Sequence, residues 1–177
     1  MNLESAVLGG GCFWCTEAIY LRVKGVTKVE PGYAGGQMPN PTYHQVCDGN
    51  TGHAEVIRVE YDRQVISYAD LLEIFWQAHD PTTRNRQGND IGSQYRSIIL
   101  TKDAEQHRIA EKSLAAAQAS GMFRRPIVTE IQPLESFYPA ENYHYDYFAN
   151  NPNQPYCRAI ISPKVKHFME VNSEKLK

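Results

Sequence analysis

The sequence predicts an α/β fold, specifically a two-layer sandwich in which helices cover one side of a mixed β-sheet with ferredoxin-like βαββαβ topology. Two observations predict it. Short apolar runs of strand type alternate along the chain with longer runs of helical periodicity. The 177 residues are 42% hydrophobic, which is enough for one core, and no repeat, low-complexity tract or linker divides them. We therefore expect one domain spanning residues 1–177, with additional helices after the βαββαβ unit.

The first elements are a strand, a helix and a second strand. Residues 5–8 are a short apolar strand, three glycines follow as a tight turn, and helix formers run from Phe13 to Gly25. Residues 26–30 predict the next strand. Residues 31–43 are rich in glycine and proline, so an irregular loop is expected there.

The middle of the chain adds a strand and an amphipathic helix. Residues 55–61 alternate strictly, which places Glu55 on the same face as Ile57, Val59 and Tyr61, the apolar face of the strand. Residues 67–70 are typical of a capping box that opens a helix through residue 78. A polar loop, residues 80–94, then leads into a strand at residues 95–100.

The remaining elements are mostly helical. Residues 104–120 are an alanine-rich helix, with Asp103 as its N-cap and Gly121 as its stop. Residues 127–131 predict an edge strand, and residues 141–149 a short helix. Residues 150–157 read as a loop by composition, after which Ser162 and Pro163 are expected to cap a last helix.

Charge and composition exclude several classes of partner. The formal net charge of −2 gives no reason to expect nucleic acid or an anionic membrane as a partner. The first residues do not resemble a signal peptide, and no later run reaches the roughly 20 apolar residues of a membrane span. Four cysteines are too few for a disulfide framework in a chain of this size, so we expect a cytoplasmic protein with free or catalytic thiols.

Cys12 is the candidate nucleophile. It lies at the predicted start of a helix, where free backbone N–H groups and the helix dipole favour the thiolate over the thiol. The preceding glycines permit positive φ and leave the approach to Cys12 free of side chains. Phe13 and Trp14 beside it could wall an apolar pocket. The competing interpretation is that these residues are simply core at a helix start.

Two other interpretations use the same cysteines. Cys12, Cys15, His44 and Cys47 are of the residue types that bind zinc, although a chain with its own core has little need of structural zinc. The Cys12–Cys15 spacing alone would also suit a thioredoxin-like dithiol oxidoreductase that acts on protein disulfides. The element order, however, lacks a clear thioredoxin pattern.

Six motifs in order cover nearly the whole chain. They are Gly11-Cys-Phe-Trp14, Gly32-Tyr-Ala-Gly-Gly36, Pro39-Asn-Pro-Thr-Tyr43, Gly52-His-Ala-Glu55, His79-Asp-Pro81 and the run RQGNDIGSQYR from Arg86 to Arg96. Together they closely resemble the peptide methionine sulfoxide reductase A family. The resemblance implies a two-layer α/β sandwich with ferredoxin-like topology and a monomer. It also implies reduction of the S epimer of methionine sulfoxide, free or in proteins, with thioredoxin as electron donor and no metal or organic cofactor.

The resemblance also implies roles for individual residues. Glu55 matches the acid that protonates the sulfoxide oxygen, and its expected place on an apolar face would raise its pKa. Tyr43 and Tyr95 match the tyrosines that hydrogen-bond this oxygen, and Asp90 matches an acidic residue that helps to hold the site. Phe13 and Trp14 fit an apolar pocket for the substrate's methyl group.

The recycling thiols are left open by the sequence. Attack by Cys12 would leave a sulfenic acid, which condenses with a second thiol to a disulfide. Cys157 lies in a predicted loop at the position that matches the family's recycling cysteine, so it is favoured as the first resolving thiol. Cys15, about one helical turn from Cys12, is the alternative or a relay. Many family members have glycine at the position of Cys15 and end in a glycine-rich tail that bears a further cysteine, which this chain lacks.

Overall fold

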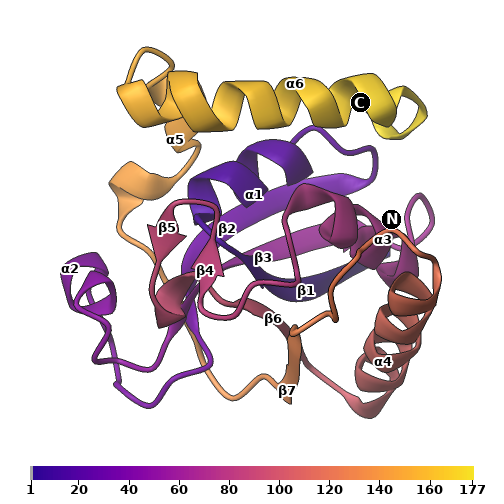
Figure 1. Cartoon of the computed structure of the whole chain (residues 1–177), viewed down its shortest axis with the longest axis horizontal. Coiled ribbons are helices and arrows are strands. Elements are labelled where there is room, and N and C mark those ends of the chain that lie inside the picture. The colour runs from indigo at the N-terminus through magenta and orange to yellow at the C-terminus, as the bar shows by residue number, and fades with distance from the viewer. Residues whose placement is uncertain (1) are drawn as a thin grey trace.

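The computed structural model describes residues 2–177 and combines a six-stranded mixed sheet with helices (Figure 1). The strands are β1 (Leu3–Gly10), β2 (Val26–Ala34), β3 (Ala54–Asp62), β4 (Arg86–Gln87), β5 (Asp90–Ile91), β6 (Ser97–Thr101), β7 (Glu130–Pro133) and β8 (Phe137–Pro139). The α-helices are α1 (Phe13–Tyr20), α2 (Tyr43–Cys47), α3 (Tyr68–Ala78), α4 (Ala104–Ala119), α5 (Tyr147–Asn150) and α6 (Ser162–Val171).

The strand order in the main sheet is β7-β6-β1-β3-β2-β8. Every pairing is antiparallel except that of β6 with β7, so the predicted mixed α/β sheet is confirmed. The predicted edge strand near residue 130 does lie at one edge of the sheet as β7. β4 and β5 form a separate two-stranded hairpin.

Helices α1 and α3 pack on one face of the sheet, with α6 against α1 and α4 against α3 (Figure 1). Side chains alternate between the two faces, since successive residues of a strand point to opposite sides. Ile57 belongs to the large core beneath the helices, and its neighbour Val56 to a smaller cluster on the other face. Glu55 shares the face of Ile57 and is buried, which confirms its predicted orientation.

The predicted helix boundaries are confirmed where the capping chemistry is local. Ser67 and Asp70 form the expected capping box at the start of α3. The Asp103 carboxylate accepts the N–H of Gln106 at the start of α4. Gly121 has a φ of +79°, the left-handed conformation in which glycine ends a helix.

The prediction of an irregular loop over residues 31–43 was wrong at both ends. Residues 31–34 continue β2, because all four pair with β3 on one side and residues 32–34 also pair with β8 on the other. Thr42 caps α2 through a capping box with Gln45. Glycine and proline indicated that a strand ends in this region, but pairing between distant segments determined where β2 ends.

Two other predicted boundaries also shift. The helix expected to reach Gly25 ends at Tyr20, and Val23 beyond it forms an isolated bridge with Leu176. The polar loop at residues 80–94 contains the β4–β5 hairpin, and Tyr95 lies in a short 3₁₀-helix (Ser93–Tyr95) rather than in β6.

The C-terminal segment differs most from prediction. The helix expected at residues 141–149 is broken into a 3₁₀ turn (Asn142–His144) and α5, separated at Asp146, which has a φ of +50°. A π-helical turn (Cys157–Ile161) runs directly into α6. Ser162 therefore lies within a continuous helix and makes no side-chain cap, so the predicted cap was wrong.

Within residues 2–177, none of the helices combines the length and the apolar character needed to cross a membrane.

Candidate active site

Cys12 lies in the turn that joins β1 to α1, at the N-cap position of the helix. Gly11 has a φ of +89°, and a Cβ atom there would lie 2.6 Å from Cγ of Gln87. Glycine is therefore required at position 11 for both backbone conformation and space. Gly9 and Gly10 belong to β1 and have no positive φ, so only the third glycine makes the turn.

Burial dominates the acid–base chemistry of Cys12, which is only 9% exposed. Burial raises the pKa of the Cys12 thiol well above its ordinary value, and a hydrogen bond with the Cys15 side chain and the nearby Glu55 raise it further. The expectation that the helix N-terminus favours a thiolate was therefore wrong, because desolvation outweighs the N–H groups and dipole there. The same hydrogen bond lowers the pKa of Cys15, so within this pair of thiols the proton is favoured on Cys12.

Glu55 lies directly beneath the start of α1 and is 1% exposed. Its Oε1 accepts the backbone N–H of Phe13 at 3.1 Å, which ties β3 to the first turn of the helix. Burial raises the pKa of Glu55 to about 8, with a smaller contribution from the charge of Asp90. A protonated carboxyl group beside Cys12, as the sequence predicts, is therefore present at neutral pH.

Asp90 and Tyr156 close one side of the site. Asp90 lies in β5, and its Oδ2 accepts the hydroxyl of Tyr156 at 2.5 Å. Asp90 also contributes to the raised pKa of Glu55, so the hairpin brings it within electrostatic reach of that carboxyl.

Tyr43 and Tyr95 reach the same region from α2 and from the 3₁₀-helix before β6. Burial raises the pKa of both phenols, and the second contribution to each is the charge of Glu55. Both phenols are therefore neutral hydrogen-bond donors near the carboxyl group of Glu55.

Trp14 belongs to an aromatic group built from distant parts of the chain. Its ring stacks on Tyr147 with centroids 3.8 Å apart and planes inclined by 6°. Phe13 lies deeper, with its ring 5.0 Å from His144 and 6.3 Å from Tyr43. The apolar wall predicted at Phe13 and Trp14 therefore exists, although helix α1 supplies only part of it.

His144 is fully buried among these rings. Its Nδ1 accepts the indole N–H of Trp14 at 3.0 Å, so the proton of the neutral ring lies on Nε2. Burial lowers the pKa of His144 to about 4, which keeps the ring neutral at physiological pH. His144 therefore fixes the edge of the Trp14 ring.

The other three cysteines differ in their burial and in the side chains that they contact. Cys15 is buried one turn along α1, with its side chain hydrogen-bonded to Cys12. Cys157 is 0% exposed at the start of the π-helical turn, so its predicted place in a loop was wrong. It is close enough to Cys15 for that thiol to raise the pKa of Cys157. Cys47 is half-buried in α2, where it contacts Tyr43.

The residues proposed for a zinc site are not assembled. Across residues 2–177, no cluster of three or more histidine, cysteine, aspartate or glutamate side chains is arranged to hold a metal ion. The structure gives no support to the zinc interpretation of Cys12, Cys15, His44 and Cys47.

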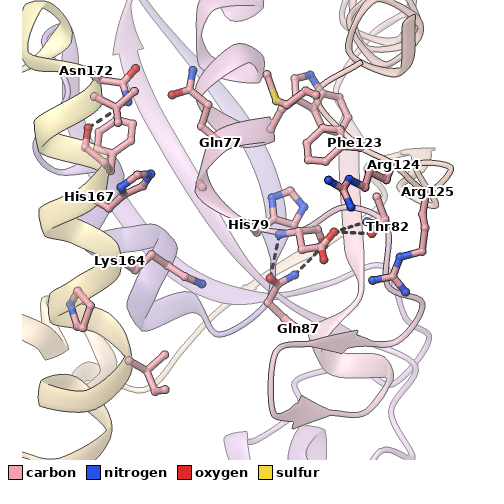
Figure 2. A pocket seen from close by; sticks show the side chains of 18 residues that line it. Gln77, His79, Thr82, Gln87, Phe123, Arg124, Arg125, Lys164, His167 and Asn172 are labelled. Carbon is pink, nitrogen blue, oxygen red and sulfur yellow. Dashed lines mark hydrogen bonds between the residues drawn. The ribbon is translucent and has the colours of Figure 1, made fainter. Parts of the chain in front are cut away.

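A pocket of about 1000 Å³ lies behind the Cys12 turn, between α6 and the end of α3 (Figure 2). Gln87 and His79 line it and also pack against Gly11 and Gly10. Lys164 reaches into it from α6 (Figure 2). None of the candidate catalytic residues lines this pocket.

Four contributors to the site were missed by sequence reasoning: Glu17, His144, Tyr147 and Tyr156. The sequence offered a signal for Tyr156, because this residue directly precedes Cys157, a candidate resolving thiol. A signal was also available for Glu17, because it is the only charged residue of the run Phe13–Tyr20. No local pattern marked His144 or Tyr147, whose contacts cross more than 125 residues of sequence.

Comparison with known proteins identifies the family of the chain. Residues 4–177 match the family model described as peptide methionine sulfoxide reductase. Peptide methionine sulfoxide reductase MsrA of Saccharolobus solfataricus is 55% identical over 175 residues, 99% of this chain and 98% of that protein.

Solved structures show the same fold. Reduced Mxr1 from Saccharomyces cerevisiae superposes with a TM-score of 0.80 at 35% identity, over 88% of this chain and 90% of that one. Mxr1 in complex with Trx2 superposes with a TM-score of 0.57 at 27% identity, over 81% and 85% of the two chains.

The fold and the site together define a class of protein, an oxidoreductase that works through thiol chemistry. The site combines a buried cysteine, a protonated glutamate and an aromatic wall. The chain belongs to the peptide methionine sulfoxide reductase A family. The thioredoxin-like alternative is not favoured, because the match to this family covers nearly the whole chain.

Proposed function

We propose that this protein reduces the S epimer of methionine sulfoxide, free and in peptides or proteins, through attack of Cys12 on the sulfoxide sulfur. The observation that carries the proposal is the placement of Cys12 next to Glu55, a carboxyl group that is protonated at neutral pH. Oxygen leaves sulfur poorly as a bare anion, so the reaction needs a proton donor at that oxygen.

Glu55 is the proton donor in this mechanism. Its proton passes to the sulfoxide oxygen as the Cys12 sulfur attacks the substrate sulfur, and the Cys12 thiol proton follows to the same oxygen, so an S–S bond forms, the substrate S–O bond breaks and water leaves. A water molecule then attacks the Cys12 sulfur, breaks the S–S bond and returns one proton to Glu55. The products are methionine and a sulfenic acid on Cys12, so the substrate is reduced and Cys12 is oxidised.

The surrounding side chains bind the two ends of the sulfoxide differently. Tyr43 and Tyr95 donate hydrogen bonds to the oxygen, and Asp90 holds the polar side of the site through Tyr156. Phe13 and Trp14 accept the methyl group. One epimer is preferred because exchanging the oxygen and the methyl group would place the oxygen against apolar rings.

Replacement of Cys12 by serine should abolish reduction and leave the fold intact, because the hydroxyl is a much poorer nucleophile at neutral pH. The measurement is thioether formation from each sulfoxide epimer with a dithiol reductant. Cys47→Ser is the matched control and should keep wild-type turnover. Turnover of Cys12→Ser above trace level, or equal use of both epimers by the wild type, contradicts the proposal.

Two thiols complete the cycle, and we propose the order Cys15 and then Cys157, which reverses the order favoured from the sequence. Cys15 already contacts Cys12, whereas Cys157 is buried in a helical turn and interacts with Cys15. The Cys15 thiol displaces water from the Cys12 sulfenic acid and forms a disulfide. Cys157 then attacks the sulfur of Cys15, forms a second disulfide and releases the Cys12 thiol.

Thioredoxin is the proposed electron donor that reduces the Cys15–Cys157 disulfide. Support comes from the complex that Mxr1 forms with Trx2. The Cys157→Ser variant should keep one fast turnover, accumulate a Cys12–Cys15 disulfide and lose thioredoxin-driven cycling. Peptide mapping after oxidation by substrate measures the pairing. If Cys15→Ser forms a Cys12–Cys157 disulfide and cycles at the wild-type rate, the proposed order is wrong.

The same proposal extends to the architecture. We infer that β1, α1, β2, β3, α3 and β6 constitute a ferredoxin-like unit, which the strand order β6-β1-β3-β2 and its antiparallel pairings support. Residues 1–177 act as one catalytic domain, as a monomer in the cytoplasm, where a reducing environment keeps thiols available for the cycle. A dimer in size-exclusion chromatography with light scattering would contradict the monomer.

A further inference from the structure

Glu17 is a buried carboxyl group that the mechanism above does not use. It lies in α1 and is 2% exposed. Its Oε2 accepts the backbone N–H of Asp146 at 2.8 Å, a contact that spans 129 residues of sequence. Burying a carboxyl group without a hydrogen-bond partner is energetically unfavourable. The hydrogen bond from Asp146 therefore offsets part of the free-energy cost of burying Glu17.

The Asp146 N–H belongs to a segment that crosses the aromatic group, residues 141–147, which we call the strap. The strap is held at three points. Glu141 accepts the backbone N–H of Tyr43 at 2.9 Å, His144 accepts the indole N–H of Trp14, and Asp146 donates to Glu17. Only the last of these anchors the end that carries Tyr147.

The strap is locally strained at this anchor. Asp146 has a φ of +50°, a left-handed conformation that non-glycine residues seldom adopt. Such a conformation persists when surrounding contacts determine it. The bond from Asp146 to Glu17 is such a contact, and the next residue, Tyr147, stacks on Trp14.

Trp14 and Glu17 are three residues apart in α1, so they lie on the same face of the helix. The two side chains contact consecutive residues of the strap, Tyr147 and Asp146. We propose that Glu17 is a positioning residue, which fixes the Asp146 turn so that Tyr147 holds the Trp14 ring in the orientation that receives the substrate. This proposal rests on the proposed role of Trp14 as a wall of the substrate pocket.

Trp14 itself reports on the proposal. The chain has only two tryptophans, so a Trp76→Phe background leaves Trp14 as the sole indole emitter. In that background we compare Glu17→Leu, Glu17→Gln, Tyr147→Ala and the Glu17→Leu/Tyr147→Ala double variant. Glu111→Leu, an exposed glutamate of α4, is the matched control. The measurements are Trp14 emission and the KM and kcat for a methionine S-sulfoxide peptide with a dithiol reductant.

Burial raises the pKa of Glu17 to about 7, so the group is partly charged at neutral pH, and loss of its hydrogen bond corresponds to about a tenfold effect. Glu17→Leu should therefore raise KM about tenfold, change kcat by less than about twofold, and shift Trp14 emission to the red. Glu17→Gln retains an acceptor oxygen and should restore most of both properties. Tyr147→Ala should resemble Glu17→Leu, and the double variant should add little, because the two residues act through one contact.

Unchanged Trp14 emission and unchanged KM in Glu17→Leu, with lower thermal stability alone, overturn the proposal. A shifted emission with unchanged KM overturns the substrate role of Trp14, and with it the positioning role of Glu17. Loss of activity in Cys12→Ser is independent of both results, so failure here is distinguishable from failure of the reaction mechanism.

If Glu17→Leu does not fold, Glu17→Gln decides the question by amide hydrogen exchange. The Asp146 amide should exchange about threefold faster or more in Glu17→Gln, since an amide oxygen is the weaker acceptor, while amides of α4 keep their wild-type rates. Equal exchange at Asp146 in the two proteins overturns the proposal.

Discussion

Cys12 and Glu55 share one physical property at the residue scale, which is that burial has the largest effect on the pKa of each. For a thiol and for a carboxyl group, burial favours the neutral form. The site at rest therefore holds both protons that the reaction needs, one on the nucleophile and one on the acid. Substrate binding supplies the sulfoxide oxygen, which accepts the proton of Glu55.

The raised pKa of Glu55 predicts how the rate depends on pH. Below about 8 the carboxyl group is protonated and can donate, and above about 8 it is charged and cannot. The single-turnover rate of Cys12 oxidation should therefore fall as pH rises through about 8, with the loss of one proton. Stopped-flow measurement between pH 6 and 10 checks this.

Glu55→Gln should remove that fall, because it leaves no titrating acid. Its rate should also be roughly 10²- to 10⁴-fold lower than wild type, the usual effect of losing a general acid. Glu73→Gln, on an exposed position of α3, is the control and should keep the wild-type profile. An unaltered fall above pH 8 in Glu55→Gln would show that another group supplies the proton.

At the scale of elements, the site is the meeting point of one helix start, one strand and several connections. β1 delivers Cys12 to the N-terminus of α1, and β3 delivers Glu55 beneath it. The remaining walls come from α2, the β4–β5 hairpin and the strap. Rigid elements therefore carry the reacting groups, and connecting segments supply much of the substrate pocket.

The junction of β1 and α1 is sensitive to a single methyl group. Gly11→Ala should lower the free energy of unfolding by more than about 1 kcal/mol and reduce the single-turnover rate at least tenfold, because an added Cβ meets Gln87 and strains a positive φ. Gly121→Ala is the matched control, since Gly121 also has a positive φ but no neighbour within 4 Å. It should cost about 1 kcal/mol and keep full activity. Equal effects of the two substitutions on activity would contradict this explanation.

For the whole molecule, stability resides in the core between the sheet and helices α1 and α3. Among residues 2–177, thirty-two buried residues form that core, against six in the cluster on the other face of the sheet. Because one large core joins the first strand to the last helix, the chain should unfold in a single cooperative step.

Ile57 and Ile91 test where this stability lies. Ile57→Ala, at a fully buried position, should lower the free energy of unfolding by about 2–5 kcal/mol. Ile91 is 73% exposed, so Ile91→Ala should change the free energy of unfolding by less than about 0.5 kcal/mol. Urea unfolding followed by circular dichroism and by fluorescence measures both, and non-coincident transitions would contradict a single cooperative domain.

The sequence by itself determined those features that depend on neighbours along the chain. A capping residue acts within one helical turn, which is why Ser67, Asp103 and Gly121 marked their helix ends correctly. Strand alternation likewise placed Glu55 on the buried face, and the motifs indicated the family.

Only the tertiary structure decided the pKa of Cys12, the helical burial of Cys157, and the strap that joins Asp146 to Glu17. Desolvation depends on every segment that covers a group, and residues 31–34 became strand because β3 and β8 lie on either side of them. Such effects come from residues far away in the sequence, so no local pattern carries them. The chemistry of this site could be named from the sequence, whereas the state of its protons follows from how the whole chain packs around it.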